Sequence, residues 1–177
     1  MKRIIVLATI LAAGTTGLAF AQESDRARER LEREIRHELV MLPYYGVFDN
    51  LAFQVEGTKV TLLGEVTRPA LKSDAEGVVK RIEGVAGVNN QIEALPLSPN
   101  DNRIRPAVYR AIYRQTNLSR YALQAIPPIH IIVKNGNVRL VGVVANEGDK
   151  RLAGIRANGV SGAFSVTNDL RVEGSQP

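Results

Sequence analysis

The chain has 177 residues, a formal net charge of +5 and no cysteine. The missing cysteine excludes disulfide bonds and a lipid-modified amino-terminal cysteine, so hydrophobic cores alone must hold the fold. Residues 23–99 carry 10 Lys and Arg against 13 Asp and Glu, whereas residues 100–177 carry 11 against 5. Because summed surface charge steers association, an anionic partner is expected to prefer the second half.

The first 21 residues have the features of a cleavable export signal. Lys2 and Arg3 give a positive start, residues 4–11 are apolar, and Ala19-Phe20-Ala21 predicts cleavage before Gln22. A membrane anchor is the alternative, but the apolar run is shorter than the roughly 20 residues that a spanning helix needs. We therefore expect a periplasmic protein, soluble or peripherally bound to a membrane. Its anionic partner is expected to be phospholipid headgroups or another envelope polyanion rather than nucleic acid.

Two hairpin-like segments repeat at a spacing of 78 residues. The alternation of apolar and polar residues is kept in both copies, as is an asparagine downstream. The matched positions are Val55, Val60, Leu62, Gly64, Val66 and Asn90 with Val133, Val138, Leu140, Gly142, Val144 and Asn168.

Each copy predicts the order helix, two strands, helix, strand. Apolar residues at helical spacing predict helices over 25–42 and 70–82 in the first copy and over 103–116 and 147–157 in the second. Period-two segments predict strands over 51–55, 60–66 and 88–95, with counterparts over 129–133, 138–144 and 164–172. Asn135-Gly136 supplies the positive φ of a tight hairpin turn.

These elements predict an α+β fold of two tandem αββαβ domains, each a three-stranded sheet covered on one face by two helices. The first domain is expected over residues 25–95, the linker over 96–100 and the second domain over 101–173. Units of this size have small cores, so the two domains are expected to pack against each other. Tyr44, Tyr45 and Phe48 crowd one loop and are the candidates for that contact.

The hairpin segments resemble the BON domain. The resemblance lies in Val60-Thr61-Leu62-Leu63-Gly64-Glu65-Val66 and Val138-Arg139-Leu140-Val141-Gly142-Val143-Val144, each followed by a helix, a Gly-Val turn and an asparagine-bearing strand. It implies the αββαβ fold, a place in the bacterial envelope, interaction with phospholipid membranes, and a role in envelope integrity or osmotic stress tolerance. Some members of the family resemble periplasmic chaperones. The chain departs from the double-domain lipoprotein members because it lacks their anchoring cysteine.

Two glycines and two asparagines recur at identical places in the copies. Gly64 and Gly142 permit either the close approach of a ligand or tight packing of a helix where a side chain is missing, and their recurrence favours packing. Asn90 and Asn168 lie among apolar neighbours, so their amides need hydrogen-bond partners. We expect both to tie down the adjacent Gly-Val loop.

Basic residues of the second copy are the candidate lipid-binding site: Arg103, Arg110, Arg114, Lys150, Arg151 and Arg156. They form one patch if their two helices lie side by side. Each Lys or Arg near an anionic bilayer contributes about 1 kcal/mol, which makes reversible binding feasible; ordinary solubilising charge is the alternative. Tyr109 and Tyr113 could anchor the domain at a membrane interface. The repeat, however, matches them to Leu31 and Ile35, so we expect them in the core.

The sequence predicts a binding protein and no enzyme. His37 and His130 have no second His or Cys at ligand spacing, so neither a catalytic residue nor a metal or other cofactor is expected. No nucleophile elbow, phosphate loop or nucleotide fingerprint is present. The leading hypothesis is reversible binding of anionic phospholipid or an envelope surface through the second domain. The alternative is a periplasmic chaperone or an adaptor that binds envelope proteins.

Overall fold

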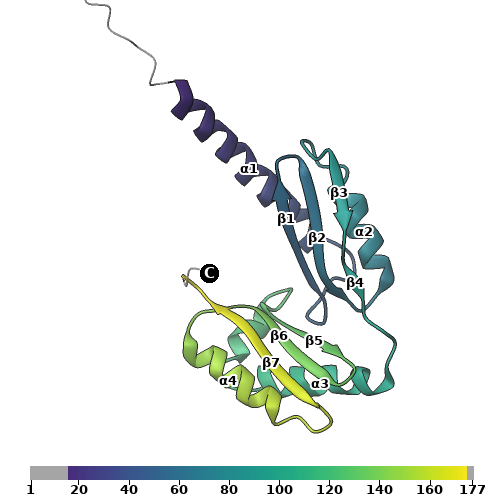
Figure 1. The fold of residues 1–177 in the computed structure, drawn as a ribbon. Helices are drawn as coiled ribbons and strands as arrows, with labels where there is room; N and C mark the ends of the chain where they lie inside the picture. Colours follow the sequence, from purple (N-terminus) through teal and green to yellow (C-terminus); the bar gives the residue numbers. More distant parts are fainter. Residues whose placement is uncertain (1–15, 175–177) are drawn as a thin grey trace, which may run out of the picture.

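The computed structural model describes the backbone of residues 16–174 and the side chains of residues 25–174. These residues form two α+β units that follow one another along the chain, which confirms the expected fold class (Figure 1). The expected export signal, residues 1–21, lies outside the residues with described side chains. Within the described part of the chain, no helix is both long and apolar enough to cross a membrane.

The two units share one order of elements. The first comprises α1 (Thr16–Val40), β1 (Asn50–Glu56), β2 (Lys59–Val66), α2 (Pro69–Val79), β3 (Gly87–Asn90) and β4 (Glu93–Ala94). The second comprises α3 (Pro99–Tyr113), the 3-10 helix η1 (Ser119–Leu123), β5 (Ile129–Lys134), β6 (Asn137–Val144), α4 (Glu147–Asn158) and β7 (Ser165–Val172). The central strands β2 and β6 each pair antiparallel with the strand before them and parallel with the strand after the helix.

Several boundaries differ from expectation, and those of α1, α3 and the third strand of the first unit bear on the architecture. Helix α1 ends at Val40, two residues before the expected end. Helix α3 begins at Pro99, inside the expected linker, because the hydroxyl of Ser98 accepts the N–H of Asp101 at 3.2 Å and caps the helix. The third strand of the first unit is split into β3 and β4, where the side-chain oxygen of Asn90 accepts the N–H of Ile92 at 3.2 Å.

The repeat keeps its spacing of 78 residues through the hairpins but not through the first helices. The buried stripes align Ile35 with Val108 and Leu39 with Ile112, a spacing of 73. The difference arises because the second unit has a longer connection, which contains η1, between its first helix and its hairpin. The expected matches of Tyr109 to Leu31 and of Tyr113 to Ile35 are therefore wrong. Tyr113 is nevertheless buried in the core, and Tyr109 packs partly buried against it, as expected.

Gly64 and Gly142 are structural, but for a reason other than the one expected. Their φ angles are +114° and +124°, a region that side chains rarely adopt. A Cβ at either site would collide with backbone of the preceding segment, at the carbonyl of Asn50 or of Pro128. The missing side chain therefore makes room for a neighbouring strand, and not for a helix as expected.

Asn90 and Asn168 tie strand to helix, whereas the Gly-Val loop was the expected partner. The side-chain amide of Asn90 donates to the carbonyl of Lys72 in α2 at 2.8 Å. That of Asn168 donates to the carbonyl of Lys150 in α4 at 2.7 Å. Each asparagine thus closes the crossover between the central and the third strand by a bond to the connecting helix.

The segment between α1 and β1 joins the two units. Val47 and Phe48 pack against the core of the second unit, and the carbonyl of Val47 accepts the N–H of Ile131 in β5 at 2.8 Å. The ring of Tyr45 stacks on His130, with 5.7 Å between centroids. Of the three aromatic residues expected at the contact, Tyr45 and Phe48 are there, while Tyr44 is exposed beside the guanidinium of Arg68.

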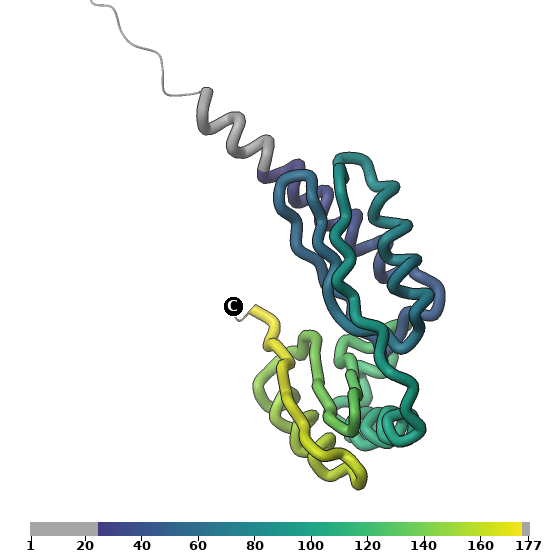
Figure 2. The backbone as a smooth tube through the Cα atoms, turned by 45° about the vertical axis from the view of Figure 1, so that its right-hand side comes forward, coloured from purple at the N-terminus to yellow at the C-terminus, as the bar shows by residue number. Residues whose placement is uncertain are grey.

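Side chains from the two sheets complete the junction. Leu95 forms a small buried cluster with Ile132 and Val141. Glu65 pairs with Arg139, and Glu93 lies 2.6 Å from the ammonium of Lys134. Both views show the units meeting at the end of the first sheet where β1 begins (Figures 1 and 2).

Gly142→Ala is expected to lower the free energy of unfolding by about 3 kcal/mol, because the new Cβ must be held at positive φ against the carbonyl of Pro128. Gly77→Ala in α2 is the control: nothing lies near its Cβ position, so helix propensity predicts a gain of roughly 0.5–1 kcal/mol. Urea denaturation of both variants measures the difference. Equal midpoints for the two would contradict the assignment.

Phe48→Ala is expected to destabilise the second unit by about 2 kcal/mol, because the partly buried ring leaves a cavity in that core. Native-state hydrogen exchange should show protection lost in β5–β7. The exposed Tyr44→Ala is the control and should change stability by no more than about 0.5 kcal/mol. Protection lost in β1 and β2 alone would show that the segment does not support the second unit.

Candidate functional site

Helix α3 places three of the expected basic residues on its solvent side. Ile104, Val108 and Ile112 face the core and are at most 1% exposed. Arg103, Arg110 and Arg114 are exposed, Arg114 as the residue that ends the helix. Arg103 donates to the side chain of Asn100 at 3.1 Å, so its guanidinium is partly engaged.

Helix α4 carries the other three basic residues and packs beside α3. Asn146 caps the helix, since its side chain accepts the N–H of Asp149 at 2.9 Å. Arg151 and Arg156 are exposed, whereas Lys150 is half-buried. The structure therefore places all six residues on two adjacent helices, with Lys150 the least accessible.

Two of the three acidic residues of the two helices are turned inward and do not neutralise this surface. Asp101 is fully buried and accepts the N–H groups of Asn135 and Gly136 at 2.9 and 2.7 Å. Asp149 is almost fully buried and accepts from the hydroxyl of Tyr121 at 2.7 Å. Both carboxylates serve the fold, which leaves Glu147 as the exposed acid of α3 and α4.

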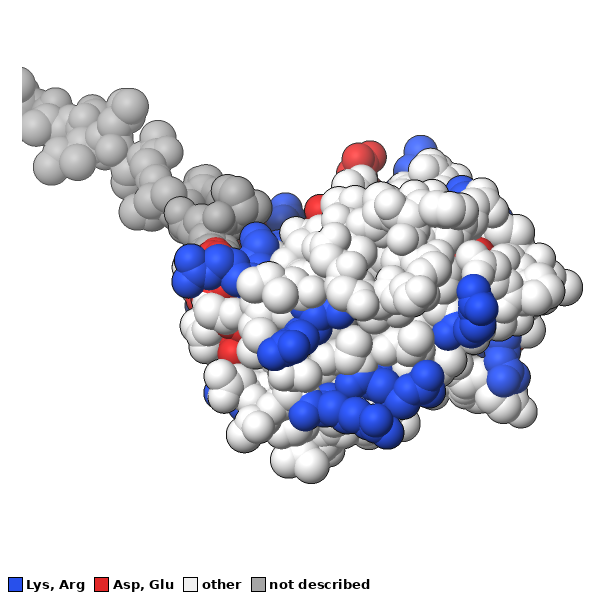
Figure 3. Space-filling model, turned by 90° about the horizontal axis from the view of Figure 1, so that it is seen from below, with Lys and Arg blue, Asp and Glu red and all other residues white. Residues whose placement is uncertain are grey.

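None of the six basic side chains takes part in an ion pair with another described residue. Seen from below, the molecule shows separate groups of Lys and Arg, and only small areas of Asp and Glu reach this view (Figure 3). We call the exposed outer side of α3 and α4, with Arg103, Arg110, Arg114, Lys150, Arg151 and Arg156, the basic helical face.

Apolar side chains accompany these charges. Ile155 is 65% exposed and lies with Arg151 at a shallow depression between α4 and the segment before η1. Leu123 at the end of η1 is 87% exposed. Tyr109 and Tyr113 do not belong to the face: the Tyr113 hydroxyl donates to the carbonyl of Ile129 at 2.7 Å, and Tyr109 packs between Tyr113 and Phe48.

Sequence reasoning missed the inward orientation of Asp101 and Asp149 and the buried Arg105. A signal for the two acids was present, because each follows a helix-capping residue, Ser98 or Asn146, by three positions. Arg105 donates to the side chain of Asn102 at 2.6 Å and to the carbonyl of Val133 at 2.9 Å, so this arginine belongs to the fold.

Both units match the same protein family. The family model described as "BON domain" matches residues 27–96 and 100–174. Among solved structures, the chain is similar to CdsD, a structural protein of the type III secretion system of Chlamydia trachomatis, with 13% identity over 80% of this chain and 91% of that one and a TM-score of 0.30. A structure of the CdsD C-terminal domain gives 12% identity over 79% and 96%, with a TM-score of 0.28.

No curated protein matches the chain. The two family matches begin at equivalent places in the units, since residues 27 and 100 are separated by the same 73 positions as the buried stripes of α1 and α3. Together they span most of the described residues, and the chain belongs to the BON domain family.

Proposed function

We propose that the protein binds anionic phospholipid reversibly through the basic helical face, without catalysis, and so supports the integrity or stress tolerance of the cell envelope. BON domains are implicated in phospholipid binding at the envelope, and the family is generally non-catalytic. The observation that carries the finer proposal is that six basic residues on two adjacent helices lack ion pairs among the described residues, while Asp101 and Asp149 are turned inward.

The expected affinity follows from the number of free charges. Arg110, Arg114, Arg151 and Arg156 are exposed, and none has a carboxylate within ion-pair distance in the described chain. At about 1 kcal/mol each, four such residues give roughly 4 kcal/mol, enough for reversible attachment. Contacts at an exposed surface are screened within about 10 Å at 0.1 M salt, so binding should weaken steeply as salt rises.

The exposed Ile155 supports a membrane surface over a soluble polyanion. It lies among arginines of α4, where an apolar side chain can enter the boundary between headgroups and acyl chains. A soluble polyanion offers this residue no apolar environment. The expected export of the chain agrees with an envelope membrane as the partner.

The intact protein is the right material for a test, because Val47 and Phe48 of the first unit complete the core of the second. Arg110→Gln/Arg114→Gln/Arg151→Gln is expected to weaken binding to phosphatidylglycerol or cardiolipin vesicles on the order of 100-fold, from about 1 kcal/mol per charge. Vesicle flotation at low and high salt measures the loss.

The matched control changes the same charge on the first unit. Arg30→Gln/Lys59→Gln/Arg81→Gln replaces three exposed residues, and binding should remain close to that of the unmodified protein. Equal losses in the two triple variants would mean that net charge alone drives adsorption, as expected for solubilising charge. Equal binding to phosphatidylcholine vesicles would also contradict the proposal.

A further inference from the structure

The outer strands β1 and β5 occupy the same place in the two units, each at one edge of its sheet. Each is joined to its central strand by a two-residue turn, closed by the pairs Glu56–Lys59 and Lys134–Asn137. In such a hairpin the closing pair is hydrogen-bonded, and the bonding alternates along the strand. Every second residue therefore directs its N–H and C=O away from the sheet: Leu51, Phe53 and Val55 in β1, and Ile129, Ile131 and Val133 in β5.

In the second unit these outward groups are occupied. Arg105 donates to the carbonyl of Val133 at 2.9 Å, and Tyr113 donates to that of Ile129 at 2.7 Å. The N–H of Ile131 donates to the carbonyl of Val47 at 2.8 Å, so a segment from the first unit lies against this edge. The three outward residues of β5 are 0% exposed.

In the first unit the same edge is open. Among residues 25–174, no hydrogen-bond partner exists for the outward groups of Phe53 and Val55, and the backbone of Leu51 interacts with the phenol oxygen of Tyr45. Leu51, Phe53 and Val55 are all partly exposed. An unpaired strand edge of this kind is a template for another strand.

The residues of α1 explain why this edge is open. At the 73-residue spacing of the helices, Glu32 and Val40 stand where α3 has Arg105 and Tyr113. The Glu32 carboxylate is bound to Arg28 at 2.9 Å and has no proton to donate to a carbonyl, and Val40 has no polar group. The two side-chain donors that close the edge of β5 are thus missing beside β1.

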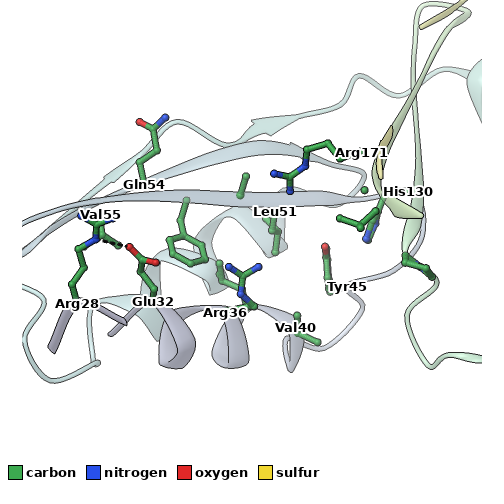
Figure 4. A pocket seen from close by; sticks show the side chains of 16 residues that line it. Arg28, Glu32, Arg36, Val40, Tyr45, Leu51, Gln54, Val55, His130 and Arg171 are labelled. Atoms are coloured by element: carbon green, nitrogen blue, oxygen red, sulfur yellow. Dashed lines mark hydrogen bonds and ion pairs between the residues drawn. The ribbon is translucent and has the colours of Figure 1, made fainter. Parts of the chain in front are cut away.

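The open edge lines a groove of about 690 Å³ between α1 and β1, with His130 of the second unit at one end (Figure 4). Five consecutive residues of β1 line it, as expected for a strand edge. Its apolar part comprises Leu39, Val40, Leu51, Ala52, Phe53, Val55, Pro128 and Val143.

The groove is positively charged. Arg36 lies on the α1 side of β1, its guanidinium 5.7 Å from the centroid of the Phe53 ring, and Arg171 lies on the opposite side in the view of Figure 4. Neither has an ion-pair partner in the described part of the chain. Burial lowers the pKa of His130, so its imidazole adds no charge at neutral pH. Arg36 and Arg171 are therefore available to pair with a carboxylate of a bound molecule.

We propose that this groove binds an extended, acidic segment of another protein, which adds a strand to the edge of β1. The outward N–H and C=O groups of Phe53 and Val55 hold its backbone, alternate apolar side chains contact the floor, and a carboxylate pairs with Arg36 or Arg171. Val47 already supplies such a backbone contact to the equivalent edge of β5. This site is separate from the basic helical face, and the inference does not depend on lipid binding.

A foreign segment fits better than the other occupants. Two copies paired through β1 would bring their Arg36 and Arg171 side chains together, so like charges would repel. The other candidate from a second copy is the segment before β5, which corresponds to residues 43–49 of the first unit. It ends in Pro127 and Pro128, which have no N–H to donate to the strand edge. An acyl chain could cover the apolar floor but would leave the backbone groups of Phe53 and Val55 without partners.

The test uses fluorescence polarisation with a labelled peptide in which valine alternates with threonine and glutamate. The same peptide, N-methylated at every second residue, keeps its side chains and charge but cannot pair with the edge. It is expected to bind at least about tenfold more weakly. Equal binding of the two peptides would overturn the proposal.

Variants test the same contact from the protein side. Val55→Pro removes an outward N–H while leaving the bonds between β1 and β2, and should weaken binding about tenfold; Val55→Thr keeps the N–H and is the control. Arg36→Gln/Arg171→Gln should weaken binding of the glutamate-containing peptide but not of the same peptide with glutamine in place of glutamate. The comparison with the N-methylated peptide tests strand pairing at β1 even if Val55→Pro does not fold.

Two further outcomes would assign the groove to another occupant and overturn the proposal. Displacement of the peptide by phosphatidylglycerol vesicles would assign it to lipid. Sedimentation of the protein as a dimer that Val55→Pro dissociates would assign the edge to a second copy.

Discussion

An edge strand directs the N–H and C=O groups of every second residue away from its sheet, and these groups need partners wherever water is excluded. The second unit meets this requirement with two side chains of α3 and the backbone carbonyl of Val47. The partner of Ile131 thus comes from the first unit. A hydrogen bond of the sheet edge and the packing of Phe48 are thus among the contacts that join the two units, and the second unit is not complete without the first.

The first unit has the same backbone order but a different edge. Only a few positions of the first helix make the difference, because Glu32 and Val40 cannot donate where Arg105 and Tyr113 do. The resulting groove is composite: α1 and β1 form its sides, and residues of the second unit bound it. The groove therefore carries positive charge, although residues 23–99 have more acidic than basic residues. One of its arginines, Arg171, comes from β7 of the second unit, and its acidic residue Glu32 is paired with Arg28.

The hairpins could be predicted from sequence because their determinants are local. Period-two alternation, the Asn135-Gly136 turn and the recurring Gly64 and Gly142 fix their register. The correspondence of the first helices could not be predicted, since an apolar stripe shows which side of a helix is buried but not the length of the connection that follows. Spacings of seven and four did place Arg103, Arg110 and Arg114 together on the solvent side of α3. The groove could not be predicted from the sequence, because it depends on missing hydrogen-bond donors and on the placement of one unit against the other.

Helix α3 connects the two proposed activities without being shared by them. Its inner side carries Arg105 and Tyr113, which close the edge of β5, and its outer side carries Arg110 and Arg114 of the basic helical face. The groove uses neither side, since its residues come from α1, β1, and the segments around His130, Val143 and Arg171. With the basic helical face on a bilayer, below the molecule as drawn in Figure 1, the first unit points away from the membrane. An extended segment would then be captured from the aqueous phase by a protein that is already held at the envelope surface.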